Sequence, residues 1–248
     1  MKYRIHHLIP ALFLGLTLCA GNSSAGVVKV AVAANFTAAM REIVQDFEQS
    51  SGHKVLVSYG STGKLYTQIL HNAPFELFLA ADQERPQLLE SKQLADDRFT
   101  YAIGKLVLWS SDKQRKVNAA ALKQGEFDRI ALANPKTAPY GAAAVSVMQK
   151  LGIDEALTAK RVQGDSIAQT YQFVATGNVE MGFVAQAQVA LIDAGRSWEI
   201  PQDLYTPIRQ DAVLLERGRD NPAALELHAY LQQEAATSVI HRYGYITE

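Results

Sequence analysis

The stretch VAVAANFT (residues 30–37) marks the point where a strand is followed by a helix. The apolar run 27–32 is typical of a strand buried on both faces of a parallel sheet. Apolar residues then recur at helical spacing, at Met40, Ile43, Val44 and Phe47. Asn35 stands where the N-cap of this helix is expected. Helix N-termini carry unpaired N–H groups and partial positive charge, so this junction can bind an oxyanion, although a simple turn with a satisfied cap has the same pattern.

Three later stretches repeat the order of strand, small or polar residues, and helix. They are GSTGKL (60–65), APYG (138–141) and DSIAQ (165–169), with Ser61, Tyr140 and Ser166 at the expected helix starts. Strands alternating with helices predict mostly parallel sheets, whose ligands bind beyond the carboxyl ends of the strands. Plainer interpretations exist, because Ser61 can belong to an ordinary turn and Tyr140 can be a packing residue. GSTGKL is not a phosphate-binding loop, since Ser58 replaces the first glycine and Leu65 follows the lysine.

Two long apolar stretches can connect two halves of the chain. The first is TYAIGKLVLWS (100–110), and the second is LYTPIRQDAVLL (204–215), which reads as one strand or a broken pair. We therefore expect an α/β protein with two parallel-sheet lobes joined by two crossing strands. Residues 26–106 and 210–248 are expected in lobe 1, and residues 107–209 in lobe 2. Proteins of this outline close on a ligand by a hinge motion.

The N-terminus has the features of a secretory signal. Lys2 and Arg4 precede an apolar run over 8–20, and the small residues 23–25 form a cleavage site, so we expect removal after Ala25 and export to the periplasm. A lipoprotein signal at Cys19 is the alternative, but it is disfavoured because the preceding Leu18 is not small. Cys19 is the only cysteine of the 248 residues, so the exported chain would have no disulfide and no thiolate metal site.

The charge of the chain excludes some partners. There are 24 Lys and Arg residues against 25 Asp and Glu residues, a formal net charge of −1. Nothing in this balance indicates binding to nucleic acid or to an anionic membrane.

The junctions belong to a larger set of motifs. These are VAVAANFT, YGSTGKLYTQI (59–69), APFELFLAAD (73–82), TYAIGKLVLWS, NPKTAPYG (134–141) and GFVAQAQV (182–189). Through them the chain closely resembles the periplasmic molybdate-binding proteins of ABC transporters, over essentially its whole exported length. The resemblance implies the two-lobed periplasmic-binding-protein type II fold, with molybdate as ligand, tungstate bound comparably and sulfate rejected. It also implies a monomer that needs no cofactor and delivers its ligand to a membrane permease.

The resemblance also implies a set of oxyanion-binding residues. Ala34 and Asn35 correspond to the first helix start of the family, where many members have Ser and others have Asn. Ser61 matches the second serine of the family, and Tyr140 matches a branch in which this Tyr donates its hydroxyl. Ile167 matches a position, often Val, that contributes its backbone N–H. Molybdenum would be held only as the oxyanion, with no direct bond from protein to metal.

One segment departs from another branch of the family. Members of that branch place a ligand-binding Tyr where this chain has Phe183 and Val184, which carry no hydroxyl. We therefore assign the hydroxyl donor to Tyr140 and expect residues 183–184 to pack in the core.

Other functional classes fit the sequence less well. An enzyme with Ser61 as nucleophile is disfavoured, because TyrGlySerThrGly lacks the Gly-x-Ser-x-Gly elbow and the histidines beyond the signal are scattered. A ligand-sensing lobe of a regulator is disfavoured by the export signal. Among binding proteins, the alternative ligand is another tetrahedral oxyanion such as sulfate, which the fold alone would not distinguish from molybdate.

Overall fold

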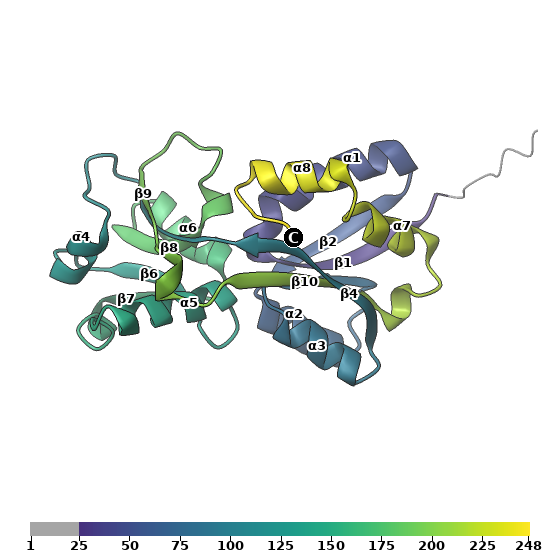
Figure 1. Ribbon diagram of the computed structural model, residues 1–248, viewed down its shortest axis with the longest axis horizontal. Helices are drawn as coiled ribbons and strands as arrows, with labels where there is room; N and C mark the ends of the chain where they lie inside the picture. The colour runs from purple at the N-terminus through teal and green to yellow at the C-terminus, as the bar shows by residue number, and fades with distance from the viewer. Residues whose placement is uncertain (1–24) are drawn as a thin grey trace, which may run out of the picture.

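Two five-stranded sheets lie side by side in the computed structural model, which describes residues 25–248 (Figure 1). Residues 1–24 of the expected signal segment, which ends at Ala25, lie outside the described residues. The first sheet has the order β2 (Lys54–Gly60), β1 (Val27–Ala33), β3 (Leu77–Leu79), β10 (Ile208–Leu215) and β4 (Ala95–Gly104). The second has the order β7 (Arg161–Gly164), β6 (Ile130–Ala133), β8 (Met181–Ala185), β5 (Leu106–Ser110) and β9 (Arg196–Glu199).

The two sheets share one pattern of strand directions. In the first, β2, β1 and β3 are parallel, and β10 runs antiparallel to both β3 and β4. In the second, β7, β6 and β8 are parallel, and β5 runs antiparallel to β8 and β9. The predicted α/β class is confirmed, with the correction that each sheet is mixed. The antiparallel strands, β10 and β5, are the ones that enter each sheet from the other half. A parallel neighbour requires a crossover connection that carries the chain back along the sheet, and a strand arriving from the other half has none.

Helices cover both faces of each sheet. Those of the first half are α1 (Thr37–Ser51), α2 (Thr62–Leu70), α3 (Glu84–Ser91), α7 (Pro222–Tyr230) and α8 (Glu234–Arg242). Those of the second half are α4 (Ala119–Gln124), α5 (Pro139–Lys150) and α6 (Ile167–Ala175). In Figure 1, α1 and α8 lie above the first sheet, and α2 and α3 lie below it.

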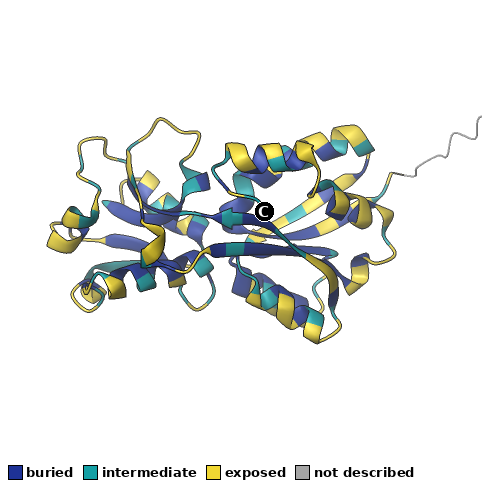
Figure 2. Ribbon diagram, in the orientation of Figure 1, coloured by how far each residue is buried: buried dark blue, intermediate teal, exposed yellow. Residues whose placement is uncertain are grey.

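Strand β1 is apolar without interruption from Val30 to Ala33, where both of its faces are covered. Val30 and Val32 pack with Phe47 and the other buried residues of α1, whereas Ala31 packs on the opposite face with Leu65 of α2. Successive side chains of a strand point to opposite faces, so a strand covered on both faces needs an unbroken apolar run. Figure 2 shows the result, with buried strands inside and exposed helix faces outside.

The chain changes sheet at Lys105. Strand β4 ends at Gly104 in the first sheet and β5 begins at Leu106 in the second, so the single long strand expected over 100–110 is two strands. The return follows β9 through a short turn of 3-10 helix (Gln202–Leu204), and only the part of 204–215 from Ile208 onward is strand.

The structure differs from the sequence-based expectations at two elements. The sequence of residues 179–191 also predicts a strand followed by a helix, and the helix is wrong, because only one turn of 3-10 helix (Gln186–Gln188) follows β8. The short, exposed strand β9 carried no recognisable apolar pattern and was not predicted. Across residues 25–248, no helix combines the length and apolar character needed to cross a membrane.

Candidate ligand-binding site

A small cavity lies between the two halves, where several strand ends and helix starts converge. It is lined by Ala33, Ala34, Asn35, Gly60, Ser61, Thr62, Ala81, Ala138, Pro139, Tyr140 and Ile167. All five residues singled out from the sequence are among them, although their role in binding stays a prediction. None of the lining residues is charged. Four helix starts therefore face one uncharged cavity.

Ser61 has a hydroxyl group without a partner. The residue is the N-cap of α2, yet its side chain makes no capping hydrogen bond. It is only 4% exposed, and its Oγ is buried with no hydrogen-bond partner among the described residues. A buried, unpaired hydroxyl costs roughly 1–3 kcal/mol. Such an atom on a cavity wall is typical of a group that binds a ligand.

Asn35 does not cap a helix, so that expectation is wrong. It lies inside a short turn of 3-10 helix (Ala34–Phe36) whose N-cap is Ala33. Its Nδ2 donates instead to Gln210 Oε1 at 2.7 Å and to Tyr245 Oη at 3.0 Å. Both amide protons are thereby used inside the protein. By its place in the first turn, Asn35 can offer the cavity its backbone N–H.

Tyr140 lies at the start of α5, directly after Pro139 in the first turn, as expected. Its side chain is buried, and its Oη accepts a hydrogen bond from Gln210 Nε2 at 3.2 Å. Burial raises the pKa of the Tyr140 phenol well above its ordinary value. The group therefore remains a hydroxyl at neutral pH and keeps a proton that it can donate.

Ile167 is the first residue of α6, and the side chain of Ser166 caps the helix by accepting from Gln169 N. The Ile167 carbonyl accepts from Gln188 Nε2 at 3.0 Å, which holds this turn against the end of β8. The N–H groups of the first turn have no intrahelical partner. Phe183, in β8, is fully buried in the core of the second half, as expected of a packing residue.

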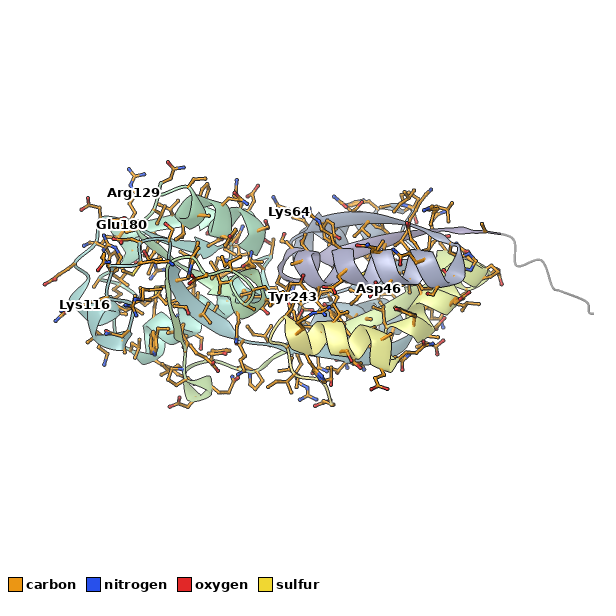
Figure 3. All side chains as sticks on the ribbon, turned by 90° about the horizontal axis from the view of Figure 1, so that it is seen from above. Asp46, Lys64, Lys116, Arg129, Glu180 and Tyr243 are labelled. Carbon is orange, nitrogen blue, oxygen red and sulfur yellow. The ribbon has the colours of Figure 1, made fainter. Side chains whose placement is uncertain are left out.

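Contacts between the halves surround the cavity. Gly63 N, in α2, donates to Thr137 O at 2.8 Å, and a Cβ on Gly63 would come within 3.0 Å of Thr137 Cα. The ammonium of Lys64 lies 2.8 Å from the Asp165 carboxylate, and Figure 3 shows Lys64 at the boundary of the two halves. Helices α2 and α6 are thus held against each other at the rim, with the cavity behind them.

Several residues that shape the site were not found from the sequence. Thr62 lines the cavity, and its Oγ1 accepts from Ala81 N at 3.0 Å, which leaves its proton free. Gln210 and Tyr245 contact Asn35, although they lie 175 and 210 residues away in the chain. No local pattern marks such partners. Within residues 25–248, no three His, Cys, Asp or Glu side chains cluster as a metal site would require.

Comparison with known proteins assigns the class of this fold and site. Residues 28–246 match the model of the bacterial extracellular solute-binding protein family, and the chain belongs to this family. It is 54% identical to the molybdate-binding protein ModA of Azotobacter vinelandii, over 99% of each chain. It is 49% identical to ModA of Rhodobacter capsulatus, over 96% of this chain and 94% of that protein. The solved structure of the periplasmic molybdate-binding protein of Azotobacter vinelandii superimposes with a TM-score of 0.86 at 35% identity, over 89% of this chain and 99% of that one.

Proposed function

We propose that this chain binds molybdate in the cavity between its halves and delivers it to an ABC transporter. It acts as a solute-binding protein, not as an enzyme. The observation that carries the proposal is the unpaired, buried hydroxyl of Ser61 on a wall that contains only neutral groups. The whole-length identity to two molybdate-binding proteins supports molybdate as the ligand.

The uncharged wall suits a fully ionised tetrahedral dianion. A hydrogen bond to a charged partner contributes roughly 1.5–3 kcal/mol, so several neutral donors can hold the anion without a lysine or arginine. We assign the donors to the Ser61 and Tyr140 hydroxyls and to the backbone N–H groups of Asn35 and Ile167, with Ala34 against the ligand. A protonated oxyanion is disfavoured, because its own O–H finds no acceptor on a wall of donors.

Selectivity then depends on size. Sulfate is smaller than molybdate, so donors spaced for molybdate would make long hydrogen bonds to sulfate. Tungstate is nearly equal in size to molybdate, and we expect comparable binding. The contacts at the rim, Gly63 with Thr137 and Lys64 with Asp165, support a closed arrangement of the halves as the state that holds the ligand.

The transport role implies a place and a partner. We propose that residues 26–106 with 210–248, and residues 107–209, move as two lobes, and that closure creates the surface that the permease recognises. The protein would work as a monomer in the periplasm, after cleavage of the signal at Ala25.

Calorimetric titration of the purified exported form with molybdate, tungstate, sulfate and phosphate tests the proposal. We expect tight binding of molybdate and tungstate and no detectable heat from sulfate or phosphate. Sulfate bound as tightly as molybdate would favour the alternative, a carrier of smaller oxyanions. Absence of binding to all four anions would overturn the proposal.

A further inference from the structure

Behind the cavity, five buried polar residues form one hydrogen-bonded network: Asn35, Tyr101, Tyr140, Gln210 and Tyr245. Gln210, on β10, is completely buried at its centre. Its Oε1 accepts from Asn35 Nδ2 at 2.7 Å and lies 3.1 Å from Tyr101 Oη, while its Nε2 donates to Tyr140 Oη at 3.2 Å. Gln210 therefore links the half that carries Asn35 to the half that carries Tyr140.

The hydrogen-bond directions along the path Tyr245, Asn35, Gln210 and Tyr140 follow from the Tyr245 end. The Tyr245 hydroxyl donates to Asn35 O at 2.9 Å, so its oxygen is free to accept from Asn35 Nδ2 at 3.0 Å. An amide nitrogen only donates, so the Gln210 atom that faces Asn35 Nδ2 must be Oε1, and Nε2 must face Tyr140. The Tyr140 oxygen is consequently the acceptor in that contact, and its proton is not used by Gln210.

We infer that Gln210 is a positioning residue that turns the Tyr140 hydroxyl so that its proton is presented to the bound oxyanion. The inference rests on the proposed function. If an acceptor stood in the place of Gln210 Nε2, Tyr140 would donate inward and direct a lone pair at a dianion. Tyr245 Oη is a second acceptor within reach of the Tyr140 proton, but it already accepts from Asn35 Nδ2, and a bound dianion is the stronger acceptor of the two.

Replacing Gln210 by Glu reverses the network without changing its shape. The carboxylate has only acceptor atoms, so it would accept a hydrogen bond from the Tyr140 hydroxyl. It would also place a negative charge next to the anion. We expect molybdate affinity at pH 8.5 to fall at least 100-fold in Gln210→Glu. Lowering the pH to 6 protonates the buried carboxyl, restores a donor and recovers a large part of the affinity.

The wild-type protein is the control for this pH profile, because its molybdate affinity is expected not to change between pH 6 and 8.5. The titratable groups that face Gln210 are the phenols of Tyr101, Tyr140 and Tyr245, and burial raises the pKa of each. The carboxylates that act on this network, through Tyr101, are Asp211, which is paired with Arg98, and Asp82, which is paired with Arg85. No group facing Gln210 changes charge between pH 6 and 8.5 in the wild type, so its affinity stays constant. The exposed Gln202→Glu adds the same charge away from the site and is expected to bind as the wild type does.

A double-mutant cycle tests whether Gln210 acts through Tyr140. Gln210→Met keeps the length of the side chain and removes its N–H, and it also serves if Gln210→Glu does not fold. We expect Gln210→Met and Tyr140→Phe each to lower molybdate affinity about tenfold. The double variant should have the same affinity as the single variant that binds less tightly. Circular dichroism and thermal melting check that each variant is folded.

Two results would overturn the inference while molybdate binding by the wild type stands. One is wild-type affinity of Gln210→Glu at pH 8.5. The other is independent effects, with the double variant weakened by the product of the two single losses. If the wild-type protein itself binds no molybdate, both the proposed function and the inference fail.

Discussion

The two sides of the cavity use equally buried polar residues in opposite ways. Ser61, on the wall, is 4% exposed and its hydroxyl has no partner; Asn35, which leads to the network behind, is 3% exposed and both its amide protons are bonded within the protein. Burial alone therefore does not separate a ligand-binding side chain from a structural one. The separation comes from hydrogen-bond satisfaction, because an unpaired buried group is unfavourable unless a ligand supplies its partner.

The largest effect is expected from Gly104→Ala, because the added methyl group clashes both with Tyr140 on the cavity wall and with Gln210 in the network behind it. A Cβ on Gly104 would lie 1.9 Å from Tyr140 Oη and 2.5 Å from Gln210 Nε2, so Tyr140 must leave its place. We expect a loss of about 1–3 kcal/mol in the free energy of unfolding, together with loss of most molybdate affinity. Chemical denaturation and calorimetry measure the two quantities.

The double variant Gly104→Ala, Tyr140→Phe is the control for this clash. Removing the hydroxyl relieves the shortest contact, so stability should partly return while affinity does not. Full molybdate affinity in Gly104→Ala alone would contradict the assigned place of Tyr140.

Asn35→Ala should act on stability. It removes the hydrogen bonds that Asn35 Nδ2 donates to Gln210 Oε1 and Tyr245 Oη in a buried site, and we expect a loss of about 2 kcal/mol in the free energy of unfolding without ligand. Urea denaturation of the ligand-free protein measures it. An unchanged midpoint would mean that the network does not stabilise the fold.

Ser61→Ala should lower molybdate affinity without lowering stability. It removes one donor to a charged ligand, so molybdate affinity should fall by roughly 1–2 kcal/mol, about five- to thirtyfold. Because no internal hydrogen bond is lost, the ligand-free protein should be as stable as the wild type, or slightly more stable. Paired calorimetry and denaturation decide; a loss of stability without a loss of affinity would remove Ser61 from the site.

Lys64→Ala should have the smallest effect, because it changes only the rim. The side chains of Lys64 and Asp165 are 49% and 72% exposed, and an exposed ion pair contributes about 0.5 kcal/mol or less. Molybdate affinity should fall less than threefold at low salt, and the difference should vanish at high salt. A tenfold loss that persists in salt would place Lys64 among the residues that bind the anion.

The wrong predictions at Asn35 and over residues 100–110 have a common cause. Asn35 matches the local pattern of an N-cap, yet its side chain bonds residues of β10 and the C-terminal segment. The strand predicted over 100–110 has the right composition, but its two parts pair with different sheets. In each case a segment distant in the chain determines which hydrogen bonds form, and the local spacing of residues carries no information about that segment.

The sequence locates the strand–helix junctions and their residues Ser61, Tyr140 and Ser166, because apolar periodicity and helix-start chemistry are local properties. It also determined the family, through motifs spread over the whole chain. The folded protein is needed to see that these junctions meet at one cavity, that the Ser61 hydroxyl is unpaired, and that Gln210 contacts Tyr140. Hydrogen-bond partners in a buried network depend on how distant segments pack against each other, and that packing exists only in the folded chain.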